Sequence, residues 1–172
     1  MTVALGVVFL AIGSLLSVLD LSSAVLASLL VSFIYLELGS PYTWLVWLAT
    51  ALLSFIMFPG SFAWLTYLSV FGIFPIMKGY IERLPRIFWM PLKLVFFNAM
   101  FTLIVLFSEV LIGQSVFGDF TGISEHQMVI YGLYVGIWLL FNLGFILYDR
   151  MIVVLVVWYE QKLRPRLANL LK

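Results

Sequence analysis

Cysteine is absent from this chain of 172 residues, and only one histidine, His126, is present. Without cysteine, disulfides, thiolate chemistry and cysteine-ligated metals are excluded, and one histidine cannot form a histidine cluster around a metal. We therefore expect no metal and no cofactor. Ser124 and Glu125 precede His126 directly, but consecutive loop residues do not converge as a catalytic triad does, so we expect no enzymatic activity.

Charge is also scarce. Charged residues make up 10% of the chain and hydrophobic residues 65%, and the mean hydropathy is +1.18. A water-soluble domain needs more polar surface than this to cover its core, so membrane lipid is the expected surrounding and nucleic acid is not an expected partner. Because a membrane-spanning helix takes about 20 residues, the chain has room for six such helices and for no soluble catalytic domain.

Six apolar stretches follow one another with short breaks, at residues 2–18, 20–36, 42–57, 61–77, 89–112 and 128–158. They predict an all-α integral membrane protein, a bundle of six transmembrane helices that occupies residues 1–158. Residues 159–172 carry leucines on one helical face and basic residues elsewhere, which predicts a basic amphipathic tail on the cytoplasmic membrane surface.

The basic residues indicate the orientation of the bundle. All nine lysines and arginines fall in two groups, at residues 78–93 and 150–172, which six alternating crossings bring to one side of the membrane. By the positive-inside rule this side is the cytoplasm, so both termini are expected there, in a multi-pass protein of the bacterial plasma membrane.

Glu109 is the most informative polar residue inside an apolar stretch. It lies near the outer end of the fifth stretch, with Gln114 just beyond it and Tyr131 and Tyr134 at matching depth on the sixth stretch. Intramembrane carboxylates mark functional sites, which favours a ligand or a proton bound in an outward-opening cavity. The alternative, equally weighted, is that Glu109 reaches up to the interface as an anchor.

Other polar residues are expected to hold helices together. Asn98 and Asn142 lie at similar depth in the fifth and sixth stretches, so we expect a hydrogen bond between them. Asp149 and Arg150 are adjacent and so face different partners on a helix. For Arg150 we expect an inner-face ion pair with one of two acids, Glu37 or Glu82.

Small residues recur at four-residue spacing in the first two stretches, at Gly13 and Ser17 and at Ala24 and Ser28. This spacing lets helix backbones approach closely. Two interpretations stay open: internal packing of the chain, or docking of a partner helix.

The six short stretches, the long outer segment at 113–127, and the small and apolar run from Ile12 through Asp20 to the Leu-Gly turn at Gly39 resemble the S components of energy-coupling factor vitamin transporters. These are their membrane-embedded, substrate-binding subunits. The resemblance implies a chain without ATPase activity that binds a small organic molecule from outside. It further implies delivery by toppling against a transmembrane coupling subunit driven by ATPases, with Gly13 and Ser17 matching the small pair that contacts the coupling subunit. The implied ligand region is the outer ends of the last three helices and comprises Trp64, Glu109, Gln114, Tyr131 and Tyr134.

The sequence thus favours a non-enzymatic, substrate-binding subunit of a transporter for a small, vitamin-like molecule. The alternative is a scaffold subunit that binds no ligand and holds a larger membrane complex together. A channel is disfavoured, because the stretches are too apolar to line a pore.

Overall fold

A computed structural model describes residues 1–16, 19–111 and 127–163; the side chains of 108–111, 127–131, 133 and 163 lie outside this description. Every regular element in the described part is helical. The elements in chain order are α1 (Thr2–Leu15), α2 (Asp20–Leu38), α3 (Ser40–Met57), α4 (Phe62–Thr66), the π-helical turn η2 (Tyr67–Phe71), α5 (Phe74–Ile81), the 3₁₀ turn η3 (Arg86–Phe88), α6 (Trp89–Leu111), α7 (Gln127–Trp158) and the π-helical turn η5 (Tyr159–Leu163).

The connections between the first helices are short for identifiable reasons. Gly39 alone separates α2 from α3, with a φ of 81°, a conformation that glycine adopts without steric cost. Pro41 follows in the first turn of α3, where its missing N–H is tolerated. The side chain of Ser61 accepts a hydrogen bond from the backbone N–H of Ala63 and so caps α4.

The fourth predicted stretch is one span built from three pieces. The chain widens into η2 after Thr66 and resumes as α5, whose first turn holds Pro75. Proline cannot supply the backbone donor of a continuous helix, which explains the interruption before it. The helix then continues to Ile81, so the predicted end of this stretch at residue 77 is wrong: Lys78 lies in the last turn of α5 and is buried.

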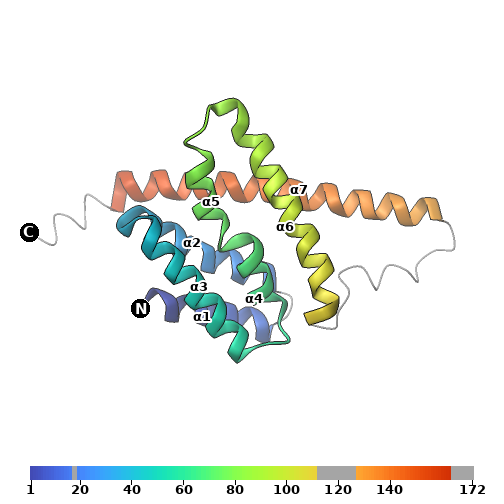
Figure 1. The fold of residues 1–172 in the computed structure, drawn as a ribbon, viewed down its shortest axis with the longest axis horizontal. Helices are drawn as coiled ribbons and strands as arrows, with labels where there is room; N and C mark the ends of the chain where they lie inside the picture. Colours follow the sequence, from blue (N-terminus) through green and yellow to red (C-terminus); the bar gives the residue numbers. More distant parts are fainter. Residues whose placement is uncertain (17–18, 112–126, 164–172) are drawn as a thin grey trace, which may run out of the picture.

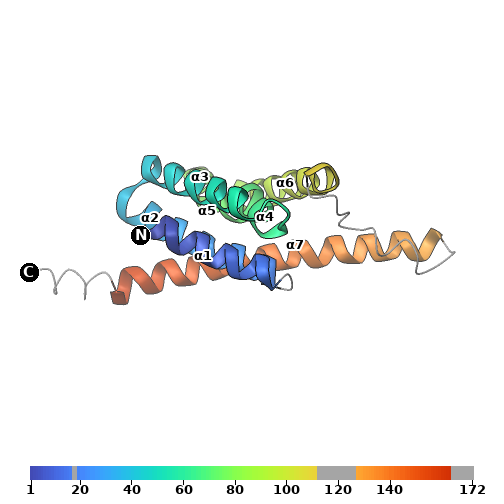
Figure 2. The same cartoon turned by 90° about the horizontal axis from the view of Figure 1, so that it is seen from below.

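Helix α2 is the centre of the bundle. It contacts α1, α3, α4, α5 and α7. Figure 2 shows α3 to α6 in one layer and α1 with α7 in the other. Thr2 and the end of η5 lie towards the same end of the molecule in both views (Figures 1 and 2).

Five helical segments are long and apolar enough to cross a membrane: Asp20–Leu38, Ser40–Met57, Phe62–Ile81, Arg86–Phe107 and Tyr134–Lys162. An all-helical chain was predicted, and the described residues confirm it, together with several helices long and apolar enough to cross a membrane. Helix α1 is apolar but has only 14 residues, about 21 Å at 1.5 Å per residue, against a hydrocarbon core of about 30 Å.

Helix α7 is the longest element, with 32 residues, or about 48 Å. Its amino-terminal part extends beyond the other helices (Figure 1). At the other end Tyr159, the first residue of the predicted tail, is buried, lies edge to face with Phe33 at 5.0 Å and donates a hydrogen bond to Glu37 (2.8 Å). The tail therefore begins packed against α2. Residues 164–172 lie outside the described part.

Candidate functional site

The main cavity of the described structure has a volume of about 490 Å³ and lies between α2, α4, η2, α6 and α7. It is partly open. Its walls are formed by Leu21, Val25, Phe62, Thr66, Val70, Phe71, Phe97, Phe101, Ile104, Leu140, Phe141, Leu143, Gly144, Phe145, Leu147 and Tyr148. Leu21 lies at the start of α2 and Phe62 at the start of α4. The end of the cavity that these two residues line is therefore at the opposite end of the bundle from the α5–α6 connection.

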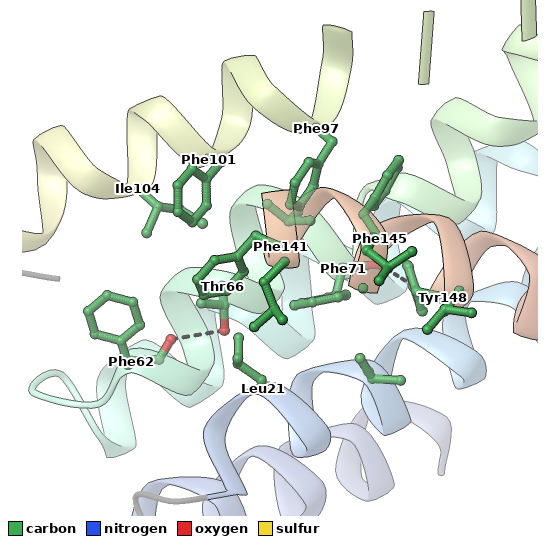
Figure 3. Close-up of a pocket in the computed structure, with 16 residues that line it drawn as sticks. Leu21, Phe62, Thr66, Phe71, Phe97, Phe101, Ile104, Phe141, Phe145 and Tyr148 are labelled. Carbon is green, nitrogen blue, oxygen red and sulfur yellow. Dashed lines mark hydrogen bonds between the residues drawn. The ribbon is translucent and has the colours of Figure 1, made fainter. Parts of the chain in front are cut away.

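Aromatic side chains of α6 and α7 form one wall. Phe97 stacks on Phe145 with ring centroids 4.4 Å apart and an angle of 14° between the planes. Phe101 lies against Phe141 at 5.0 Å. These rings project from facing helices towards the space between them (Figure 3). Such pairs contribute about 0.5–1.5 kcal/mol beyond the area that they bury, so this wall is rigid.

Tyr148 closes the cavity at its inner end. Ser28 of α2 donates to the carbonyl of Val25 (2.6 Å) and thus accepts from the Tyr148 hydroxyl (2.6 Å). The same hydroxyl lies 3.2 Å from the carbonyl oxygen of Phe71, as the dashed line in Figure 3 marks. Tyr148 therefore ties α7 to α2 and to η2.

An ionic cluster lies directly beyond this floor and consists of the buried residues Lys78, Lys93 and Asp149 and the partly exposed Glu82. Lys93 lies 3.0 Å from an oxygen of Asp149 and 2.8 Å from one of Glu82. Lys78 binds the same Asp149 oxygen and lies 3.1 Å from Glu82. Two ammonium groups and two carboxylates compensate one another, as buried charges must. The ionic cluster joins the last turn of α5 and the first turns of α6 to the carboxy-terminal third of α7.

The predicted ion pair of Arg150 is wrong, because both candidate acids have other partners. Glu82 binds two lysines, and Glu37 accepts from Tyr159. Arg150 is exposed, whereas its neighbour Asp149 is buried, in keeping with the expectation that the two face different partners. The structure pairs Asp149 with Lys93 and Lys78 instead. Lys93 could have indicated this in the sequence, because it is a lysine at the fifth position of an apolar helix.

The predicted contact of Asn98 with Asn142 is present. The Asn98 amide donates to Asn142 Oδ1 (2.9 Å) and to the carbonyl of Leu94 (2.8 Å). Trp138 donates its indole N–H to Asn98 Oδ1 at 2.6 Å, which supplies the partner that an indole at membrane depth requires. This amide clamp holds α6 to α7 on the side of the aromatic wall.

Two of the five predicted ligand residues have described side chains, and neither lines the main cavity. Trp64 is buried, donates to the carbonyl of Pro59 (3.1 Å) and lies beside a separate hollow of about 240 Å³ with Phe55. Tyr134 is half-buried. The side chains of Glu109, Gln114 and Tyr131 lie outside the described part, so their role stays a prediction.

The small residues pack inside the chain. Gly13 is buried against Ser23, Ala24 is fully buried, and Ser28 is buried and bonded to Tyr148. They do not form an exposed docking stripe in this structure, which supports internal packing over partner docking; Ser17 lies outside the described residues.

The sequence analysis did not identify the residues that line the cavity. The pattern that could have indicated them is a pair of phenylalanines four residues apart on each of two helices, Phe97 with Phe101 and Phe141 with Phe145. That spacing is also typical of an ordinary helix core, so the sequence could not distinguish a wall from a filled interior.

In the described ranges, no group of three or more acids and histidines is placed to hold a metal ion. Comparison of the whole chain with protein-family models, with curated proteins and with solved structures gives no match.

Proposed function

We propose that this chain is a six-span, non-enzymatic protein of the bacterial plasma membrane that binds a small molecule in its main cavity. Its role is that of the substrate-binding subunit of an uptake transporter, with both termini in the cytoplasm. A transmembrane coupling subunit and ATPases are the partners that this role requires.

The observation that carries the proposal is the cavity itself. A volume of about 490 Å³ lies within the range of small-molecule sites, about 300–1,000 Å³. The end of the cavity that Leu21 and Phe62 line lies away from the basic α5–α6 connection, which supports capture from the outer half of the membrane. Its floor is tied by Tyr148 and backed by the ionic cluster, so a ligand has no path inward without movement of α7.

The orientation is supported by the exposed basic residues. Arg83 and Arg86 stand in the connection between α5 and α6 and Lys162 follows α7, whereas the connection at residues 58–61 carries no charge. The positive-inside rule therefore favours a cytoplasmic α5–α6 connection. On this orientation α1 provides the sixth crossing, tilted little because of its short length.

A scaffold role is the second candidate. It is favoured by the part of α7 that extends beyond the bundle, where Val135 and Leu139 are both 56% exposed. That surface offers an apolar helix face to other membrane proteins.

Purification of the full chain from its native membranes tests the proposal. A coupling subunit and ATPases in stoichiometric amounts, together with a small molecule released on denaturation, are the expected result. Cell-envelope machinery in their place and no released molecule would instead support the scaffold. Glu109→Ala should weaken retention of the molecule if Glu109 reaches the site from α6.

A further inference from the structure

We propose that the ligand portion held in the main cavity is an uncharged hydrocarbon chain that enters sideways from the bilayer. This inference rests on the proposed function and names the chemical class of the substrate.

The hydrogen-bonding groups of the cavity wall are already used. Among the described lining residues, only Thr66 and Tyr148 carry polar side-chain atoms. The Thr66 hydroxyl donates to the carbonyls of Phe62 and Ala63, both at 3.0 Å. The Tyr148 hydroxyl is directed at Ser28 and Phe71. A carbonyl or carboxylate of a ligand would therefore find no free side-chain donor on this wall, and an unpaired polar group in such a place is unfavourable.

No charged side chain is among the described residues that line the cavity. Two acids adjoin lining residues along the chain: Asp20, which precedes Leu21 on α2, and Asp149, which follows Tyr148 on α7. The Asp149 carboxylate is bound by Lys78 and Lys93 and is buried in the ionic cluster. Asp20 lies outside the cavity wall, at its Leu21 end, with a buried oxygen that has no hydrogen-bond partner in the described structure. The described wall thus holds no cation for an anionic ligand and no acid of its own for a cationic one, whereas a hydrocarbon needs neither.

The open side of the cavity faces lipid. Leu140, Leu143 and Leu147 of α7 line it and are 69%, 57% and 63% exposed, and Leu21 on the facing end of α2 is 44% exposed. In a membrane-spanning bundle such leucines meet acyl chains. A hydrocarbon can therefore pass from the bilayer to the rings of Phe101 and Phe141 without crossing a polar barrier (Figure 3).

Photolabelling of the full chain in phosphatidylcholine nanodiscs tests this inference. One probe is a free long-chain alkane that carries a diazirine, and the other is a phosphatidylcholine with the diazirine in an acyl chain. Peptide mapping should find label on cavity residues such as Phe71 and Phe101, above the level on outward residues of α3 such as Leu52. Cavity label from the lipid probe alone assigns the site to a lipid chain, and label from the alkane assigns it to a free hydrocarbon.

Two glycines of α7 give a matched pair of variants. A Cβ built at Gly144 or at Gly136 meets no atom within 4 Å, but only Gly144 lines the cavity. Gly144→Phe should fill the mouth and lower cavity labelling about tenfold, the factor that corresponds to ~1.4 kcal/mol. Gly136→Phe should leave it unchanged, and equal thermal unfolding of the two variants shows that both fold.

The inference is overturned if cavity residues are labelled no more than Leu52, or if Gly144→Phe has no effect on their labelling. It is also overturned if a charged, water-soluble vitamin such as thiamine displaces the alkane from the cavity, a result that would leave the transporter role intact. Cavity labelling without any co-purified coupling subunit or ATPase has the opposite meaning: the hydrocarbon site stands and the transporter role fails.

Discussion

Tyr148 and Asp149 are neighbours on α7, yet they face two different environments. The Tyr148 hydroxyl ends the apolar cavity and binds Ser28 at 2.6 Å, while the Asp149 carboxylate holds Lys93 at 3.0 Å on the far side of that floor. One peptide unit of α7 thus separates the proposed ligand site from the ionic cluster, and any shift of α7 moves both.

Loss of the Asp149 charge should destabilise the protein strongly. Asp149→Asn leaves Lys78 and Lys93 buried with only Glu82 as a counter-charge. Breaking a buried ionic pair from one side costs about 3–5 kcal/mol. Reversible denaturant titration in mixed micelles measures the free energy of unfolding. Arg150→Gln, on the exposed next residue, is the control and should change it by less than about 0.5 kcal/mol; equal losses in the two variants would refute a central role for the ionic cluster.

Two tyrosine hydroxyls should differ in their contribution to stability. Tyr148→Phe removes the contacts with Ser28 and Phe71, and intramembrane hydrogen bonds are worth about 0.6–1.7 kcal/mol. The hydroxyl of Tyr67 is buried in η2 and makes no hydrogen bond of good geometry, although the Thr50 side chain interacts with it, so Tyr67→Phe should cost less than Tyr148→Phe. The same titration compares the two variants, and a larger loss for Tyr67→Phe would contradict the hydrogen-bond assignment.

Removal of the amide clamp should loosen α6 from α7. Asn98→Leu leaves the Trp138 indole N–H and the Asn142 amide without their acceptor, at a cost of about 1–2 kcal/mol. The emission of Trp138, followed in a variant that retains it as the single tryptophan, should shift when its hydrogen bond is lost. Thr102→Val, one turn further along α6, serves as the control because its hydroxyl bonds only the backbone carbonyl of Asn98.

The α1–α2 contact should not tolerate a methyl group at Gly13. A Cβ there would lie 2.7 Å from the Cβ of Ser23 and closer still to its hydroxyl oxygen. Overpacking of this kind costs about 1–3 kcal/mol, so Gly13→Ala should lower the unfolding temperature. Gly136→Ala enters open space within α7 and should raise it slightly, because alanine favours helix by about 0.8–1.0 kcal/mol over glycine. Similar shifts for the two variants would show that α1 and α2 are not in close contact.

The absence of cysteine permits a clean test of orientation. Gly60→Cys lies in the connection from α3 to α4 and Arg86→Cys in the one from α5 to α6, at opposite ends of one span, and both positions are exposed. In intact cells a membrane-impermeant maleimide should label the cysteine at 60 and not the one at 86, which should react only after the membrane is opened. The reverse pattern would invert the proposed topology.

The sequence predicted the helices well because hydropathy and length determine them. The bounds of the predicted stretches at 89–112 and 128–158 differ from those of α6 and α7 by at most one residue. The Asn98–Asn142 bond also matches the prediction from depth, although α6 and α7 cross steeply rather than run antiparallel (Figure 1).

The sequence could not predict which face each helix turns towards the bundle interior, or which residues pair across it. The expected depth of Arg150 in the membrane suggested that it lies near acidic residues. In the structure α7 turns Arg150 outward and Asp149 inward. The packing of α5 and α6 then determines which cations bind Asp149. The cavity depends in the same way on how far Phe97 and Phe145 hold the two helices apart, a distance that no spacing in the chain encodes.

The order of synthesis gives the ionic cluster a second significance. Lys78 precedes Asp149 by 71 positions and Lys93 precedes it by 56, so both lysines reach the membrane before their main counter-ion has been made. On the proposed orientation, they still count during that interval as positive charges that retain the α5–α6 connection on the cytoplasmic side. Arrival of the last helix then neutralises them, which makes its insertion the step that converts a topogenic signal into a closed structure.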